Sequence, residues 1–232
     1  MAQGKTRSVK RRQFLSSVAA FPLLGITGDQ ASDQRSSEDI LSGTTDSPLR
    51  LGLIGFGNRG EELFGELLQS DQKAEIHAIC EIFDQRLRRA LKASGGEIRS
   101  YHNYMDLLKD SAIDAVIIAT PEHWHAPMAV EAARRGKHIY LETAMTRSLE
   151  EAKAIREAVR TSGVVFQLGH QGRHRDLNHK ARELLSNDIH GKISLIETTT
   201  NRNDQEGTWK AKEGEPAGPE NIDWELFQGP TA

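Results

Sequence analysis

Three glycines at fixed spacing form the part of this sequence with the clearest chemical meaning. Gly55, Gly57 and Gly60 fit the pattern G-x-G-x-x-G, with Asn58 and Arg59 between the last two glycines. The pattern follows an apolar run and opens a stretch of helical period, so we expect a loop between a strand and a helix. There the first glycine makes a tight turn, the second lets the backbone approach a pyrophosphate, and the third lets the helix pack on the strand. The sequence therefore predicts a dinucleotide-binding loop; the alternative is a glycine-rich turn without a ligand.

An acidic residue roughly twenty positions after the loop favours one form of the dinucleotide. Glu81 stands at the end of the second apolar run. A carboxylate there can accept hydrogen bonds from the adenosine ribose and repel a 2′-phosphate, so NAD is favoured over NADP. Three arginines nearby, Arg86, Arg88 and Arg89, keep NADP as the alternative. They could reach a phosphate or could form a solvated helix face.

Several histidines follow in the middle of the chain and raise the question of a metal. Glu122, His123 and His125 stand close together, but alternate positions on a loop need not converge and no further ligands cluster nearby. We therefore predict no metal site. His170 and His174 are expected to be polar groups of the surface or of a pocket.

The elements that must position these residues follow from alternating apolar runs and helical periods. Strands are expected at residues 50–55, 75–80, 112–119, 138–142, 164–168 and 193–200. Helical spacing predicts crossover helices around residues 63–68 and 126–135. Ser148 opens a capping box that places another helix at about 149–161. Parallel strands joined by right-handed crossovers predict an α/β fold with a doubly wound Rossmann sheet.

The first 47 residues are expected to lie outside this fold. A basic segment without acids precedes an apolar run at residues 14–26, which is too short at ~1.5 Å per residue to cross a ~30 Å hydrocarbon core. Arg11-Arg12-Gln13-Phe14-Leu15 resembles a twin-arginine export signal. Residues 1–28 are therefore predicted to direct export to the periplasm or another extracytoplasmic space, with a disordered basic tail as the alternative. The polar residues 29–47 predict a disordered linker.

Composition narrows the class of protein. The 232 residues have room for one domain and part of another, and the formal net charge is −3. Lys and Arg are spread along the chain after the first dozen residues, so we expect no nucleic-acid partner. The single cysteine, Cys80, excludes an internal disulfide and a cysteine-based zinc cluster, and we expect it in the core.

Two segments near the expected strand ends carry a specific pattern. They read Thr120-Pro121-Glu122-His123-Trp124-His125 and, at residues 135–142, Arg-Gly-Lys-His-Ile-Tyr-Leu-Glu. Together with residues 169–173 and 224–230 they resemble the glucose–fructose oxidoreductase and inositol dehydrogenase family (Gfo/Idh/MocA). The resemblance implies an NAD(P)-dependent oxidoreductase acting on a sugar or cyclitol derivative. It also implies that Thr120, Pro121 and His125 lie beside the nicotinamide and its ribose, and that Glu142 contacts the cofactor ribose.

The sequence departs from the family where the family has a catalytic lysine. The family signature Glu-Lys-Pro is replaced here by Glu142-Thr143-Ala144. Thr143 has no cation and no pKa that burial could bring near neutrality, so it cannot replace that lysine as acid or base. Ala144 also lacks the fixed φ of proline. No catalytic residue is therefore assigned, and His125 remains a possible one.

The resemblance implies two domains. Residues 48–169 are expected to form the NAD(P)-binding domain, and residues 170–232 only the beginning of an incomplete α+β substrate domain. The unpaired edge of a strand at 193–200 would favour a homo-oligomer, or a different partner chain that covers this edge and completes the substrate domain. Four functions stay open: an oxidoreductase that is inactive as this truncated chain, a non-catalytic NAD-binding remnant or subunit, an NAD-dependent glycosidase of the same family, and a purely structural or interaction protein.

Overall fold

The computed structural model describes residues 48–69, 74–186 and 220–229, with a few single positions between 191 and 218. Its strands are β1 (Leu49–Ile54), β2 (Ala74–Cys80), β3 (Arg99–Tyr101), β4 (Ala115–Ile118), β5 (His138–Leu141) and β6 (Phe166–Leu168). They form one sheet in the order β3-β2-β1-β4-β5-β6, and each neighbouring pair is parallel. The predicted α/β fold with a Rossmann sheet is confirmed.

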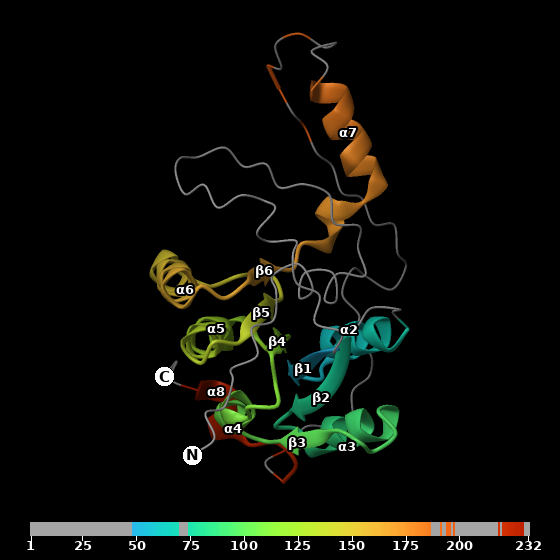
Figure 1. The fold of residues 1–232 in the computed structure, drawn as a ribbon, viewed down its shortest axis with the longest axis vertical. Coiled ribbons are helices and arrows are strands. Elements are labelled where there is room, and N and C mark those ends of the chain that lie inside the picture. The colour runs from blue at the N-terminus through green and yellow to red at the C-terminus, as the bar shows by residue number, and fades with distance from the viewer. Residues whose placement is uncertain are drawn as a thin grey trace, which may run out of the picture.

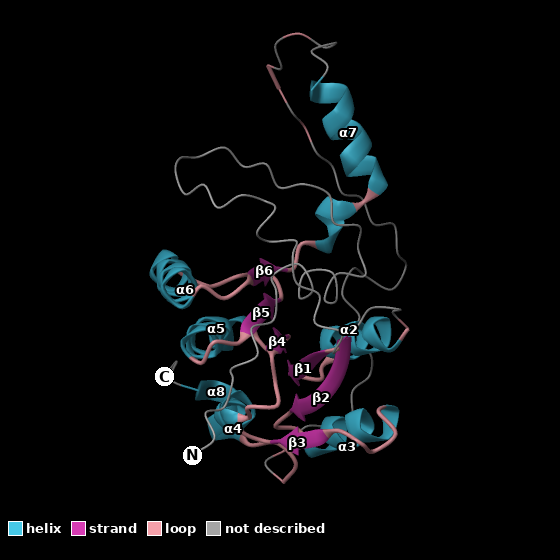
Figure 2. Ribbon diagram, viewed as in Figure 1, coloured by secondary structure: helices cyan, strands magenta, loops and turns pink. Residues whose placement is uncertain are grey.

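Helices cover both faces of this sheet. They are α2 (Asn58–Leu68), α3 (Asp84–Ala93), α4 (Tyr104–Lys109), α5 (His125–Arg134), α6 (Leu149–Ser162), α7 (Asp176–Ser186) and α8 (Trp224–Gln228), with 3-10 turns η1 (Glu122–Trp124) and η2 (Gln171–His174). Helices α2 and α3 lie on one face, and α4, α5 and α6 lie on the other (Figures 1 and 2). The sheet is therefore doubly wound, and the carboxyl ends of its strands meet at one edge.

The central strands are continuous apolar runs because both of their faces are covered. Every residue of β4 is buried, and Leu51 and Leu53 of β1 have no exposed surface. Two hydrophobic clusters result, one between the sheet and α5 and one between the sheet and α2 with α3. Cys80 lies in the first cluster, as expected, and burial raises the pKa of its thiol. The core thus fixes the strand ends on which the polar residues stand.

The predicted capping box at Ser148 is confirmed. The Ser148 hydroxyl accepts a hydrogen bond from the Glu151 amide at 3.2 Å, and the Glu151 carboxylate accepts one from the Ser148 amide at 3.3 Å. Helix α6 then ends at Gly163, whose φ of 69° suits a residue without a side chain. Local sequence therefore determines both ends of this helix.

Some strand predictions were wrong or lie outside the described residues. The strand expected at 112–119 begins only at Ala115, because Asp110 accepts the Ala112 amide in a turn. Strand β3 was missed, since Arg-Ser-Tyr carries no apolar run. Residues 1–47 and most of 193–200 lie outside the described residues. Among the helices that the structure describes, none is long and apolar enough to cross a membrane.

Candidate functional site

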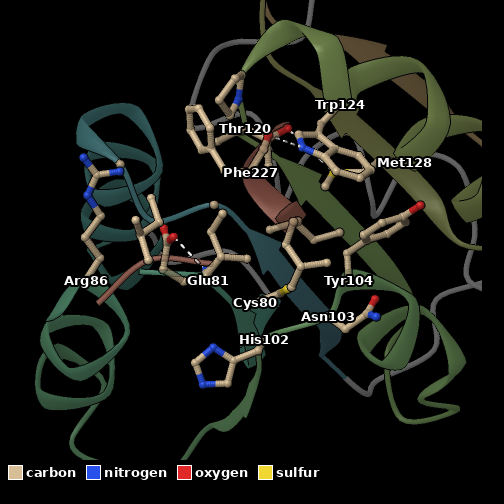
Figure 3. Close-up of a pocket in the computed structure, with 18 of the residues that line it drawn as sticks. Cys80, Glu81, Arg86, His102, Asn103, Tyr104, Thr120, Trp124, Met128 and Phe227 are labelled. Carbon is tan, nitrogen blue, oxygen red and sulfur yellow. Dashed lines mark hydrogen bonds between the residues drawn. The ribbon is translucent and has the colours of Figure 1, made fainter. Parts of the chain in front are cut away.

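A cavity of about 340 Å³ opens at the carboxyl ends of the strands. Its walls come from the glycine loop after β1, the ends of β2 and β3, the turn after β4, and α8. Figure 3 shows Glu81 and Arg86 on one side of this cavity, and Trp124 and Tyr104 on another. Open α/β sheets bind ligands at this edge. The cavity therefore brings together residues that the sequence predicted separately.

The glycines of the loop have the geometry that their expected roles require. Gly55 has a φ of +92°, and a Cβ there would lie 2.7 Å from the Ala119 carbonyl oxygen. A Cβ on Gly60 would lie 2.1 Å from the carbonyl oxygen of Gly55. A Cβ on Gly57 would meet only the Arg86 guanidinium, at 3.6 Å. The first and third glycines thus permit close packing, while the second leaves room for a ligand.

The same loop leads into α2, whose first turn lacks a side-chain cap. Gly57 is the N-cap residue and has no side chain to accept the amides that follow. Unpartnered amides at a helix start, together with the helix dipole, favour a bound anion. The loop can therefore hold a pyrophosphate through its backbone.

Glu81 fixes this loop to the end of β2. Its carboxylate is buried, and one oxygen accepts the Phe56 amide at 2.7 Å. The other oxygen accepts the amides of Ile82 and Phe83 at 2.8 and 3.0 Å. The sequence predicted that Glu81 contacts a ribose but not that its carboxylate organises the loop. A residue that lines the cavity thus also supports it.

The three arginines near Glu81 differ in position. Arg88 is exposed, as a solvated helix face predicts. Arg89 lies 3.5 Å from the Glu61 carboxylate. Arg86 lines the cavity, with its guanidinium carbon 5.4 Å from the centre of the Phe83 ring. Among the three, Arg86 is the one placed to meet a phosphate.

The turn after β4 contributes Thr120 and Pro121 to the cavity wall. His125, by contrast, has no exposed surface and does not line the cavity. Its Nδ1 lies 2.6 Å from the Ala144 carbonyl oxygen and its Nε2 lies 2.9 Å from that of Thr120. The ring therefore joins the loops that follow β4 and β5, and a direct role at a substrate would require these contacts to open.

Glu142 joins the end of β5 to the first turn of α2. Its carboxylate accepts Arg59 Nε at 2.7 Å, the Tyr140 hydroxyl at 3.0 Å and the Thr143 amide at 3.0 Å. Burial disfavours the charged form, but these hydrogen bonds and the Arg59 charge outweigh it and hold the pKa of Glu142 below its usual value. Thr143, at the position of the family lysine, is exposed.

Glu142→Gln is expected to lower the free energy of unfolding by about 2 kcal/mol at pH 7, because Arg59 loses the most buried of its carboxylate partners and keeps the more exposed Glu62 and Glu66. The folded-state pKa of Glu142 is lowered, so its contribution is present above the ordinary value of 4.5 and is lost as pH falls through the lowered pKa. Urea unfolding of both proteins should show a difference that shrinks below about pH 4. Glu97→Gln, at an exposed position, is the control and should leave stability unchanged. A difference that is constant with pH would contradict the ion pair.

The residues considered as metal ligands point to different partners. His123 Nε2 lies 2.7 Å from the Phe227 carbonyl oxygen, while both nitrogens of His125 face carbonyl oxygens. Within the ranges that the structure describes, no three His, Cys, Asp or Glu side chains gather where they could hold a metal ion. The contact of His123 and Trp124 with Phe227 was not predicted, because 103 or more residues separate them in sequence.

Comparison with known proteins agrees with this geometry. Residues 49–170 match the model of the Gfo/Idh/MocA oxidoreductase family, described by its NAD-binding Rossmann fold. The scyllo-inositol 2-dehydrogenase (NAD(+)) of Bacillus subtilis is 36% identical over 121 residues, which cover 52% of this chain and 35% of the relative. A Shewanella protein named glycosyl hydrolase family 109 protein 2 is 41% identical over 111 residues, covering 44% of this chain and 24% of the relative.

Solved structures show the same likeness. The myo-inositol 2-dehydrogenase of Lactobacillus plantarum superposes with a TM-score of 0.60 at 28% identity, covering 63% of this chain and 43% of that enzyme. The chain spans about a third of the length of the Bacillus subtilis dehydrogenase and about a quarter of the length of the Shewanella protein.

Proposed function

Because this chain belongs to the Gfo/Idh/MocA oxidoreductase family and carries its NAD-binding Rossmann fold, we propose that it serves hydride transfer between NAD and a sugar or cyclitol derivative. The observation that carries the proposal is the glycine loop. Gly57 has no side chain, so the space in front of the loop stays open to a ligand. Gly57 also stands directly before the start of α2, which has no side-chain cap. When bound, NAD supplies the acceptor for the hydride.

The residues of this site fit the parts of the dinucleotide in order along the sheet. The backbone around Gly57 would hold the pyrophosphate, with Glu81 toward the adenosine ribose. Thr120 and Glu142 stand at the ends of β4 and β5, on the side where the nicotinamide half would extend. His125 would position Thr120 through its carbonyl rather than touch the cofactor.

We expect residues 1–232 to bind NAD without turning it over. Thr143 replaces the lysine of the family and cannot donate or accept a proton near neutral pH. The neighbouring Glu142 carboxylate is instead held by its hydrogen bonds from Arg59 and Tyr140. Substrate-dependent formation of NADH by this chain alone would overturn this part of the proposal.

Calorimetric titration of the folded chain tests the cofactor directly. We expect saturable binding of NAD, weaker binding of NADP, and loss of both in Gly57→Trp, because the indole would cover the pyrophosphate position. Gly65→Trp is the matched control. Gly65 lies in the helix that Gly57 caps, and a Cβ there would meet nothing within 4 Å. Binding that survives in Gly57→Trp would place the dinucleotide elsewhere, and no binding by the folded parent would remove the proposal.

A second candidate is a glycosidase that uses NAD for transient oxidation. It is favoured by the 41% identity to the protein named glycosyl hydrolase family 109 protein 2. Cleavage of a chromogenic aryl glycoside that requires NAD but forms no net NADH would distinguish it from the oxidoreductase.

Residues 1–28 are further proposed to direct export by the twin-arginine route. Arg11 and Arg12, followed by a modestly apolar segment, support this. Export of a folded protein would let the cofactor be bound before transport. Cell fractionation of an Arg11→Lys, Arg12→Lys variant tests it.

A further inference from the structure

Part of the cavity wall comes from a segment far from the glycine loop in sequence. Ile222, Leu226 and Phe227 line the cavity together with Ile54 and Ile82 from the strand ends. Figure 3 shows Phe227 beside Thr120 and Trp124, above the ends of the strands. This segment therefore adds three apolar side chains to the cavity wall.

Both ends of this segment, residues 221–229, are fixed to the Rossmann domain. At one end Ile222 pairs with Phe83 in an antiparallel bridge, and Asn221 accepts the Asp84 amide at 3.2 Å. At the other end the Phe227 carbonyl oxygen accepts Trp124 Nε1 at 2.9 Å. The segment thus spans from the loop after β2, next to Glu81, to the turn after β4.

The end of the segment packs closely against the Rossmann domain. Gly229 has a φ of +62°, and a Cβ there would lie 2.4 Å from the Trp124 ring. The rings of Trp224 and Phe227 are in edge contact, with centroids 5.4 Å apart. Trp124 therefore holds the end of α8 through its hydrogen bond to the Phe227 carbonyl oxygen and through the packing of its ring against Gly229.

The position of the cavity along the sheet identifies which half of a dinucleotide it can take. Glu81, Arg86 and His102 line one part of it and follow β2 and β3, while Thr120, Pro121 and Trp124 line another part and follow β4. Glu142 and Thr143, which follow β5, do not line it. Because the pyrophosphate would rest on the loop after β1, the part of the cavity next to Glu81, where Ile222 pairs with Phe83, lies on the adenosine side.

We propose that Ile222 and Leu226 complete the adenine subsite of this domain, with Phe227 fixing their position through Trp124. The inference rests on the proposed function in that the ligand is NAD. A purine has two apolar faces, and a cavity of about 340 Å³ that has isoleucine and leucine side chains in its wall and lies next to a phosphate-binding loop suits it. The adenine subsite is therefore formed by two segments that lie far apart in sequence, the region of the glycine loop and residues 222–227.

Calorimetric titration with AMP, ADP-ribose and NAD tests this assignment. Leu226→Ala is expected to weaken all three ligands by a similar factor of roughly fivefold to tenfold, since it removes apolar contact with the base that they share. Leu226→Trp is expected to weaken them further by filling the cavity. Glu225→Ala, at an exposed position of the same helix, is the matched control and should change none of the three. Circular dichroism establishes that each variant is folded.

The outcomes separate this inference from the proposed function. Absence of NAD binding by the unmodified chain would remove the proposed function and this inference with it. Normal NAD binding that neither Leu226 variant changes would overturn the inference alone. Weaker NAD binding with unchanged AMP binding would assign the segment to the nicotinamide half, and tighter binding in Leu226→Ala would show that α8 obstructs the site; both overturn it.

Discussion

Gly60→Ala is expected to lower the free energy of unfolding by about 3 kcal/mol and to abolish measurable NAD binding. The new Cβ would lie 2.1 Å from the carbonyl oxygen of Gly55, which is backbone and cannot rotate away. Gly55 cannot retreat either, because its own Cα faces the Ala119 carbonyl. Helix α2 would therefore have to move off β1, and the loop between them would lose its shape. Urea unfolding followed by circular dichroism, with calorimetric titration of NAD, measures both effects.

The same helix provides the control for this prediction. Gly65 lies in the interior of α2, where a Cβ meets nothing within 4 Å. Gly65→Ala is expected to stabilise the protein by about 0.5–1 kcal/mol, because alanine favours the helix, and to leave NAD binding unchanged. Equal stability changes in the two variants would show that the contact of Gly60 with Gly55 does not determine the loop.

Glu81→Ala is expected to destabilise the protein by roughly 3–5 kcal/mol, since the buried amides of Phe56 and Phe83 and the partly buried amide of Ile82 would lose their acceptor. We also expect NAD affinity to fall by at least about tenfold, because the amide of Phe56 belongs to the glycine loop. Hydrogen exchange at the Phe56 and Phe83 amides should become faster in the variant. This last result separates support of the loop from a contact with the ribose alone.

Two further variants define what Glu81 does. Glu81→Gln keeps one acceptor oxygen and should be intermediate in stability. Glu75→Ala, at a largely exposed position on strand β2, which Glu81 follows, should change stability by no more than about 0.5 kcal/mol. A Glu81→Ala variant with normal stability and slow amide exchange, but weak NAD binding, would assign Glu81 to the ribose only.

Local sequence determined much of the scaffold. The apolar runs, the G-x-G-x-x-G spacing and the capping box at Ser148 predicted most strands, the loop and helix α6, because each depends on residues within a few positions of one another. The family was also identified from short segments. Strand β3 was missed for the same reason, since three residues without an apolar pattern form a strand only by pairing with β2.

The contacts that complete the site were decided by tertiary structure. Glu81 reaches Phe56 across 25 positions, Arg59 reaches Glu142 across 83, and Trp124 reaches Phe227 across 103. Hydrogen-bonding groups on separate strand ends come together only when the sheet forms, and the sequence does not state which of several acceptors each donor will meet. The sequence by itself thus determined the sheet, the loop and the cofactor class. Only the fold decided that Glu81 supports the loop, that His125 is enclosed between two carbonyls, and that residues 222–227 close the cavity.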